Sequence, residues 1–394
     1  MLPAPNTSAP DILVVGAGLS GLLAALCCAR THRVTVLDAS PIAPPDVIAG
    51  DTRASFLSQS SLRLLDALGV KVARQPVRRI LAGEGDPGRP LRGEPLRFEL
   101  DGEDLGAVVE NGKLHAALLL RAAEGVDLRG GVEVRGFRTE PDAAVLDTSE
   151  GVSRAPLAIA ADGARSRLRT LAGIGTSEHD YGQRALTFTL HHTEPHGGAA
   201  FQIFFPNGPL ALLPLSGNRS SVVWTDTPKA VRAAEALPRD ALVAELARRI
   251  GPGLGALTVP GPLRSYPLHQ VVAESSTSDR LALVGDAAHF VHPLAGQGLN
   301  LTARDAAALA DVVAEAKSLG RDIGGPALRD YARWRSGDIS ATAVATDAFH
   351  HIFGWTGALG ALRRLGTSRV RGELARRFAR EAAGLRPNLP ALMR

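Results

Sequence analysis

Cysteine is scarce in this sequence, and its scarcity excludes two kinds of structural cross-link. Only two cysteines occur in the 394 residues, and these residues, Cys27 and Cys28, are adjacent. Neighbouring residues rarely reach disulfide geometry, and no third cysteine is present. A disulfide framework and a cysteine-based zinc site are therefore both excluded. Reduced, buried thiols in a cytosolic protein are the interpretation that remains.

Lysine is also rare, and acidic and basic residues nearly balance except at one end of the chain. Residues 361–394 hold nine arginines against two glutamates, whereas the remainder holds 35 basic and 38 acidic residues. The net charge of +4 therefore belongs to the C-terminal segment. Three interpretations stay open for that segment: a solvated amphipathic helix, a surface that docks on anionic membrane, and a nucleic-acid site. Nucleic acid is the least favoured, since only Phe378 interleaves the arginines and no binding motif accompanies them.

A targeting signal and a membrane span are not expected. The first ten residues carry no positive charge of the kind that begins a secretory signal. One apolar stretch, residues 12–29, is long enough to be mistaken for a span. Its glycines, and its strand-like first half followed by a helix-like second half, fit a βα unit better. The expected location is cytoplasmic.

Enough apolar residues are present, at 45%, for a sizeable core, and the length suggests two or three domains. Residues 11–38 contain an apolar strand, a helix and a second strand, which make a βαβ unit. From residue 185 to 225 the pattern changes to short strands separated by turns, which indicates an antiparallel sheet. A buried strand at 280–286 and a helix at 298–318 then resume the first pattern. We therefore expect a discontinuous first domain (1–75, 104–180 and 272–340), a second domain (76–103 and 181–271) and a helical C-terminal region (341–394).

The first motif that carries chemistry is the glycine pattern Gly16, Gly18 and Gly21, which follows the first strand and opens the helix. Gly16 permits a tight turn, Gly18 lets a pyrophosphate approach the backbone, and Gly21 allows the helix to pack closely on the strand. Asp38 ends the next strand, where its carboxylate could accept hydrogen bonds from ribose hydroxyls. A purely structural glycine turn is the alternative. The motif predicts a bound dinucleotide without distinguishing NAD from FAD.

A second motif lies at residues 280–300, where a strand ends at Gly285 and Asp286 and a loop leads to the helix that begins near Gly298. The Asp286 carboxylate could hold a hydroxyl of a cofactor, and the backbone N–H groups of Leu299 and Asn300 are free to face an anion. An ordinary strand–turn–helix is the alternative, and spacing alone does not exclude it.

Taken together, these motifs resemble the FAD-dependent aromatic-ring monooxygenases of the hydroxybenzoate hydroxylase superfamily. More narrowly, they resemble the UbiH/UbiF group, which hydroxylates ubiquinone precursors. The resemblance runs nearly end to end, and its further residues are 51–54 (DTRA), 58–70, 110–114 (ENGKL), 161–166 (ADGARS), 204–224, 292–300 (HPLAGQGLN) and 378–392. One departure is 302–305 (TARD), where the group more often has Gly-Leu/Ile-Arg-Asp. The resemblance implies an α/β fold: a Rossmann-like FAD-binding domain of the glutathione reductase type, an inserted antiparallel substrate domain and a helical C-terminus.

The resemblance also assigns roles to residues. Arg53 is similar to an arginine near the FAD pyrophosphate and flavin, and Asn111 to a polar residue that contacts the cofactor. Asp162 and Gly163 resemble a second pyrophosphate motif, which in this superfamily also serves NAD(P)H. Pro293 and Gly296 lie in the loop expected to face the flavin. Candidates for the wall of the substrate pocket are Phe204, Leu213, Trp224 and Tyr266, with core packing as the alternative for each.

The reaction implied is hydroxylation of the ring of a polyprenylated phenol. In this family NAD(P)H reduces the flavin, O2 adds to give a C4a-hydroperoxide, and its distal oxygen passes to the substrate. No second glycine fingerprint is present, so NAD(P)H is expected to bind transiently. A reductase of the same fold, and an inactive flavin-binding subunit of a quinone-biosynthesis complex, are the alternatives. The partners expected are the aromatic substrate, O2, and a membrane surface or biosynthetic complex at the arginine-rich segment.

No metal site is expected. His191, His192, Glu194 and His196 form the cluster most similar to one. Adjacent residues of a strand point to opposite faces, however, so His191 and His192 could not easily share an ion. His289 is expected to make structural hydrogen bonds, and the role of His292 stays open.

Overall fold

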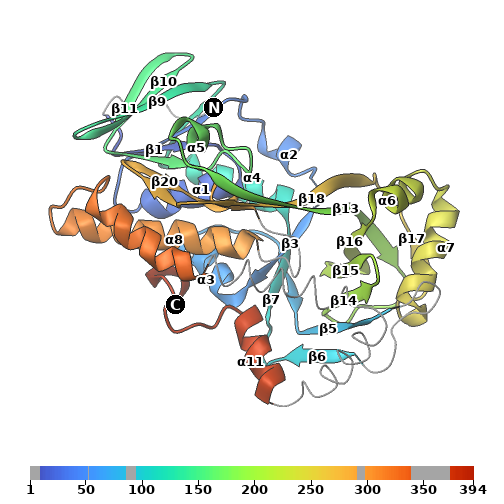
Figure 1. Cartoon of the computed structure of the whole chain (residues 1–394). Helices are drawn as coiled ribbons and strands as arrows, with labels where there is room; N and C mark the ends of the chain where they lie inside the picture. Colours follow the sequence, from blue (N-terminus) through green and yellow to red (C-terminus); the bar gives the residue numbers. More distant parts are fainter. Residues whose placement is uncertain (1–8, 52, 86–94, 291–297, 339–372) are drawn as a thin grey trace.

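The computed structural model describes residues 9–51, 53–85, 95–290, 298–338 and 373–394. Pro293, Gly296 and His292 lie outside these ranges, as do four of the nine arginines of the C-terminal segment. Within the described ranges the chain forms two large sheets, one in each half of the molecule, and residues of both halves line a cavity between them (Figure 1).

The first large sheet has six strands in the order β19-β20-β12-β1-β2-β8. Its central strands are short, apolar and parallel, because each is followed by a crossover rather than a hairpin. Helix α1 makes the first crossover, and β19 is the one antiparallel strand. The elements are β1 (Ile12–Val15), α1 (Leu19–Cys28), β2 (Val34–Asp38), β8 (Asp127–Gly130), β12 (Leu157–Ala160), β19 (Thr277–Ser278) and β20 (Leu281–Leu283).

Alternation along these strands fills two cores. Ile12 and Val14 of β1 point to one face and pack with helices α1, α4 (Asn111–Ala122) and α8 (Gly298–Ser318). Leu13 and Val15 point to the other face and pack with a three-stranded sheet. That sheet consists of β9 (Val134–Glu140), β10 (Ala143–Thr148) and β11 (Gly151–Ala155), drawn above the six-stranded sheet in Figure 1. Cys27 and Cys28 are free and buried in the first core, and burial raises the pKa of the Cys28 thiol to about 12.

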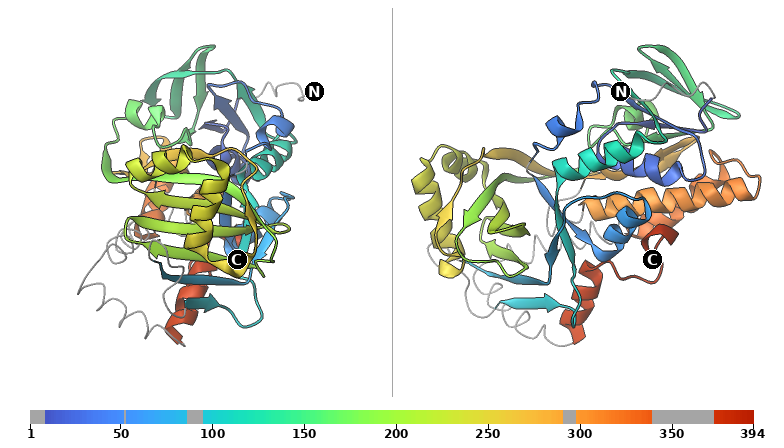
Figure 2. Two further views of the ribbon diagram at one scale, coloured as in Figure 1. Left: turned by 90° about the vertical axis from the view of Figure 1, so that its right-hand side faces the viewer. Right: turned by 180° about the vertical axis from the view of Figure 1, so that it is seen from behind.

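The second large sheet has nine strands, eight of them in the order β21-β18-β13-β16-β15-β14-β5-β6, with β17 paired to β13. It is antiparallel except where β14 runs parallel to β5, which brings β5 and its partner β6 into it. Figure 2 shows α6 (Pro228–Glu235) and α7 (Arg239–Ile250) covering its outer face. Its strands are β5 (Arg79–Glu84), β6 (Leu96–Glu99), β13 (Thr176–His192), β14 (Ala199–Phe205), β15 (Gly208–Leu215), β16 (Arg219–Asp226), β17 (Leu257–Thr258), β18 (Arg264–Ala273) and β21 (His289–Phe290).

Smaller elements join the two halves. A third sheet, β3 (Ala54–Ser58), β7 (Gly106–Glu110) and β4 (Gln75–Val77), lies between them. Residues 326–338 are helical, α11 (Glu373–Ala382) packs against β6, and the turn η4 (Ala391–Met393) packs against α3 and α8. The remaining elements are α2 (Pro45–Ile48), α3 (Gln59–Ala67), α5 (Arg167–Leu171), η1 (Pro252–Leu254) and η2 (Gly285–Ala287).

The expected fold class is confirmed: an α/β domain carries an inserted antiparallel sheet, and the described part of the C-terminus is mainly helical. Strands β13 and β18 cross the expected boundaries near residues 180 and 271, so the two halves share continuous strands. No helix among the described residues combines the length and the apolar character needed to cross a bilayer.

Candidate functional site

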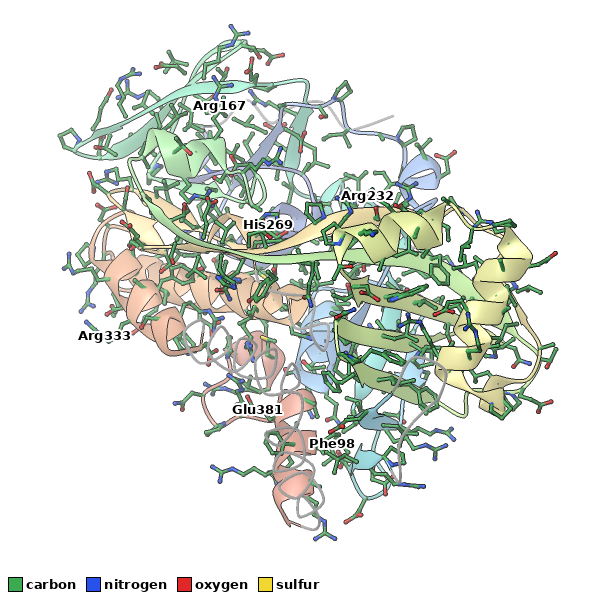
Figure 3. The ribbon with its side chains drawn as sticks, turned by 45° about the vertical axis from the view of Figure 1, so that its right-hand side comes forward. Phe98, Arg167, Arg232, His269, Arg333 and Glu381 are labelled. Carbon is green, nitrogen blue, oxygen red and sulfur yellow. The ribbon has the colours of Figure 1, made fainter. Side chains whose placement is uncertain are left out.

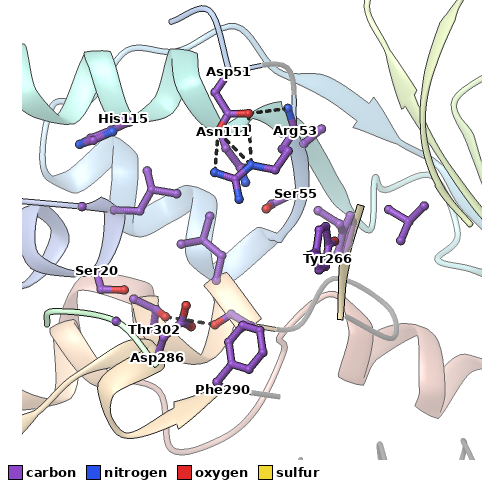
Figure 4. A pocket seen from close by; sticks show the side chains of 18 of the residues that line it. Ser20, Asp51, Arg53, Ser55, Asn111, His115, Tyr266, Asp286, Phe290 and Thr302 are labelled. Atoms are coloured by element: carbon purple, nitrogen blue, oxygen red, sulfur yellow. Dashed lines mark hydrogen bonds and ion pairs between the residues drawn. The ribbon is translucent and has the colours of Figure 1, made fainter. Parts of the chain in front are cut away.

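A cavity of about 1540 Å³, lined by described residues of both halves, lies between the two halves. Its walls come from the turn after β1, the start of α4, the turn after β12, the inner face of the nine-stranded sheet and the start of α8. Figure 4 shows Arg53, Asp51 and Asn111 on one side, with Asp286 and Thr302 facing them. Ten of the thirteen residues expected to bind the cofactor line this cavity: Gly16, Gly18, Asp38, Arg53, Asn111, Asp162, Gly163, Asp286, Gly298 and Leu299.

The glycine turn is built for close approach. Gly16 has φ +107°, and a Cβ there would lie 2.4 Å from the carbonyl oxygen of Ala161. A Cβ on Gly21 would lie 1.8 Å from the carbonyl oxygen of Gly16, so helix α1 can start here only without a side chain. Gly18, by contrast, has open space where its Cβ would be. Gly21 thus acts in packing rather than as a cavity residue, and Gly18 leaves its backbone open to a ligand.

The start of α1 offers unpaired donors beside a carboxylate. No side chain caps the helix at Gly18 and no acidic residue occupies its first turn, so its leading N–H groups face the cavity without a side-chain partner. The Asp38 carboxylate accepts the N–H groups of Ala17 at 2.7 Å and of Ser40 at 2.8 Å. This fixes the carboxylate at the cavity wall with lone pairs to spare. Such an arrangement suits a pyrophosphate followed by a ribose.

Arg53, the residue before β3, lines the cavity together with Asp51. Its Nη2 lies 2.6 Å from Asp51 Oδ2, and its Nε also donates to that carboxylate (Figure 4). The hydrogen bonds to Asp51 raise the pKa of Arg53. Burial alone would raise the pKa of Asp51, but the hydrogen bonds and charge of Arg53 lower it below its usual value. Both groups therefore stay charged. Next to them, Asn111 Oδ1 is buried without a hydrogen-bond partner, which leaves an acceptor for a donor on a ligand.

The second motif divides into cavity residues and supporting residues. Asp286 lines the cavity, and burial raises the pKa of its carboxyl group. Gly285 and Asn300 do not line it. The Asn300 side chain instead accepts the Ser58 N–H at 2.9 Å and donates to the Phe56 carbonyl at 2.9 Å, which ties β3 to α8. That the backbone N–H of Asn300 faces an anion of the cofactor remains a prediction.

The turn at Gly285 is held from behind by a buried carboxylate that the motif did not single out. Asp305 is fully buried, and its oxygens accept the Gly285 N–H at 3.0 Å, His289 Nε2 at 2.5 Å and Arg335 Nε at 2.7 Å. Burial alone would raise the pKa of Asp305, but His289 and Arg335 lower it to about 2. This contact agrees with a structural role for His289.

Asp162 lines the cavity and also has a structural role. Its carboxylate accepts the Ser166 hydroxyl at 2.5 Å and the Arg167 N–H at 2.8 Å, so it orders the turn before α5. Gly163 follows with φ +87° and open space around it. Residues that the sequence did not single out also lie here: His115, whose Nε2 contacts the Ala17 carbonyl at 2.7 Å, and Glu133. Both come from elements distant in sequence, and no local pattern marked them.

Three of the four candidates for the substrate wall line the cavity: Phe204, Leu213 and Tyr266. The prediction for Trp224 was wrong. In β16 it pairs with Leu210 and points to the outer face, where its ring packs in the core under α6 and α7. Arg249 of α7 covers that ring at 4.4 Å from its centroid. On the cavity face of the same strand stand Ser221 and Val223.

Part of the arginine-rich segment also forms the cavity wall, which the sequence did not indicate. Phe378, Glu381 and Ala382 of α11, and Arg386 after it, line the end of the cavity away from the glycine turn. The ring of Phe378 meets Phe98 of β6 edge-on, with centroids 6.1 Å apart. The histidine cluster lies elsewhere, where His192 bonds with the Glu194 carbonyl and the Ser220 hydroxyl.

The comparisons with known proteins agree with this geometry. Residues 9–322 match the family model described as FAD binding domain. The chain is 39% identical to the ubiquinone hydroxylase UbiL of Rhodospirillum rubrum, over 98% of this chain and 92% of that protein. It is 36% identical to the 3-demethoxyubiquinol 3-hydroxylase of Escherichia coli, over 87% and 90% of the two chains.

Solved structures show the same fold. The p-nitrophenol 4-monooxygenase PnpA of Pseudomonas putida superposes with a TM-score of 0.76 at 20% identity, over 95% of this chain and 98% of that one. HpxO of Klebsiella pneumoniae, complexed with FAD and uric acid, gives a TM-score of 0.74 at 22% identity, over 95% of each chain. The chain therefore belongs to the FAD-dependent monooxygenases of the hydroxybenzoate hydroxylase superfamily, in the group that contains the ubiquinone hydroxylases.

Proposed function

We propose that this monooxygenase hydroxylates the aromatic ring of a polyprenylated phenol, a precursor of ubiquinone, with NAD(P)H and O2 as co-substrates. The observation that carries the proposal is the cavity that joins the glycine turn of α1 to the apolar inner face of the nine-stranded sheet. One end fits a dinucleotide, and the other fits an apolar substrate. The names of the related ubiquinone hydroxylases support the substrate class.

The cavity offers FAD a set of contacts that match its chemistry. The free N–H groups of α1 and the open backbone at Gly18 suit its pyrophosphate, and Asp38 suits its ribose. Asp286 and the unpaired Asn111 Oδ1 suit the hydroxyl and N–H groups nearer the flavin. Gly298 and Leu299, at the start of α8, line the same cavity, and we expect their backbone N–H groups to donate to the cofactor. When bound, FAD supplies the electron transfer and the activation of O2.

Side chains of the protein supply a fixed positive charge, a hydrogen bond to the substrate and the exclusion of water. Arg53 stays charged through Asp51 and places a fixed cation at the cavity wall. Burial raises the pKa of Tyr266, so its hydroxyl stays protonated and can donate a hydrogen bond to an oxygen of the substrate. Phe204, Leu213 and Phe290 exclude water from the reacting centre.

The arginine-rich segment supports a proposal about partners. Arg376, Arg377 and Arg380 of α11 are exposed, and α11 stands at the end of the cavity that suits the apolar substrate. An anionic membrane surface, or a partner within a quinone-biosynthesis complex, would meet the substrate and these charges together. A cytoplasmic enzyme bound peripherally to the inner face of the membrane fits this arrangement.

The test is turnover by the purified holoenzyme with prenylated phenols. We expect each phenol accepted to stimulate NAD(P)H and O2 consumption and to gain one oxygen atom, measured by mass spectrometry. Turnover without O2 would favour the reductase, and a bound flavin without any turnover would favour the inactive subunit. Rescue of quinone-pathway mutants that are blocked at different hydroxylation steps identifies the ring position. Failure to rescue any of them would contradict the proposed substrate class.

A further inference from the structure

The cavity face of the nine-stranded sheet carries polar side chains on one side and apolar side chains on the other. Strands β18, β13 and β16 contribute Tyr266, His269, Thr187 and Ser221, which carry hydroxyl and imidazole groups. Strands β5 and β6, at the opposite side of the same sheet, contribute only apolar side chains to the cavity: Ile80, Ala82, Leu96 and Phe98. Figure 3 shows His269 beside the FAD-binding half and Phe98 beside α11, well apart in the molecule.

The strands between these two sides make the change gradual. On β15 and β14 the cavity residues are apolar, with Gln202 as the polar exception: Ala211, Leu213, Ala200, Phe201 and Phe204. Small and large apolar residues thus alternate across the sheet, which leaves a groove over the small ones. Neighbouring strands are about 4.8 Å apart, so the four steps from β16 to β6 span roughly 19 Å. That length suits a chain of several isoprene units rather than a second ring.

The far end of the groove is apolar and partly open. Phe378 of α11 lines it and is 42% exposed, although a large apolar side chain gains little stability at a surface. The charged groups beside it, Glu381 and Arg386, pair with each other, and Arg386 also pairs with Asp338 at 2.8 Å. The described rim therefore presents no unpaired carboxylate to an apolar chain.

We infer that the groove over β15, β14, β5 and β6, ending at the ring pair Phe98 and Phe378, is the binding site for the prenyl chain of the substrate. The oxygenated ring lies at the other end, against Thr187, Ser221 and Tyr266 and beside the residues proposed to hold FAD. The hydroxyl of Thr187 already donates to the Arg264 carbonyl at 3.2 Å, so it accepts rather than donates toward the ring. This inference rests on the proposed function and adds the orientation of the substrate.

The test uses the holoenzyme and a series of phenols with the same ring and zero to several isoprene units. Each unit that enters the groove buries apolar surface, so KM falls several-fold per unit until the groove is full and then levels off. Ala82→Phe fills the groove in the middle of its path. It raises KM for the long-chain phenol about tenfold or more, and it raises KM for the phenol without a chain by a much smaller factor. Phe378→Ala raises the long-chain KM in the same direction.

Leu81→Phe is the matched control, because Leu81 is the neighbouring residue of β5 and its side chain points to the opposite face. It adds the same ring to the same strand and leaves KM unchanged along the whole series. Flavin absorbance and the melting temperature of each variant establish that FAD binding and folding are intact.

The outcomes separate the inference from the proposed function. If no phenol of the series is hydroxylated, the proposed function is wrong. If phenols are hydroxylated with a KM that does not depend on chain length, the prenyl chain lies elsewhere and the inference is overturned. The same holds if Ala82→Phe and Leu81→Phe change KM for the long-chain phenol equally.

Discussion

Asp305 gives the sharpest prediction, because its carboxylate connects three segments that build the site. It holds the turn at Gly285, the strand residue His289 and the helix residue Arg335 from a position with no solvent exposure. Removing one partner from a buried ion pair costs about 3–5 kcal/mol, since the other charge stays buried. Arg335 keeps a second partner, Asp338, at 2.5 Å. We therefore expect Asp305→Ala to lose about 3 kcal/mol of the free energy of unfolding, the lower part of that range.

The assay is urea unfolding of the FAD-free protein, followed by circular dichroism so that cofactor binding does not contribute. Asp330→Ala is the control, because Asp330 pairs with Arg333 on the same helix at 3.1 Å but both side chains are exposed. An exposed pair contributes about 0–1 kcal/mol, so the control changes little. A loss of less than about 1 kcal/mol for Asp305→Ala would refute the reasoning, because a buried charge would then be tolerated without its partner.

The pH dependence of the same residue provides an independent check. The pKa of Asp305 is lowered in the folded protein from 3.8 to about 2, which means that folding favours the carboxylate. The corresponding stabilisation, roughly 2 kcal/mol, is present above the unfolded value and disappears as the pH falls through the folded value. The stability difference between wild type and Asp305→Asn should therefore narrow between about pH 4 and pH 2. A difference that is constant over this interval would contradict the assignment.

Three further predictions concern the cofactor and the substrate wall. Asp286→Ala should weaken FAD binding about tenfold or more in a fluorescence titration, because a hydrogen bond to a charged group is lost; unchanged binding would remove Asp286 from the site. Gly21→Ala should cost about 2 kcal/mol or more of stability, since its Cβ would meet the Gly16 carbonyl, whereas Gly18→Ala should leave the stability of the FAD-free protein intact and weaken FAD binding. Trp224→Phe should leave the KM for the phenol unchanged and Phe204→Ala should raise it, because only Phe204 faces the cavity; the reverse result would restore Trp224 to the pocket.

The parts of the fold that the sequence predicted are those with local signals. The βαβ unit could be predicted because the glycines, the apolar strands and Asp38 all fall within residues 11–38. The antiparallel sheet could be predicted because alternation is visible within each strand. The expected second domain already included residues 76–103, but the pairing of β5 with β14, more than a hundred residues later in the chain, has no local signal.

Trp224 shows where alternation stops being informative. Period two divides the residues of a strand into two faces, but it does not say which face meets the cavity. That choice depends on register, and the register pairs Leu213 with Ser221 and Leu210 with Trp224. The face that holds Leu213 is therefore the face from which Trp224 points away.

Asp305 and Phe378 were missed for a different reason. Asp305 lies inside a helix, where a single carboxylate is usually solvated, and its partners His289 and Arg335 come from other elements. Phe378 stands in a run of arginines that suggested a surface helix, and only its contact with Phe98 reveals that α11 forms part of a wall.

The part that α11 plays in the cavity wall has a consequence for folding during synthesis on the ribosome. Strands β5 and β6 are made before β20, α8 and α11, which follow in that order along the chain. A nascent chain can thus form its first βαβ unit while the apolar edge that Phe378 later covers is still bare. Such late, long-range closure slows folding and calls for chaperone protection. The cavity described above is therefore complete only once α8 and α11 have been made.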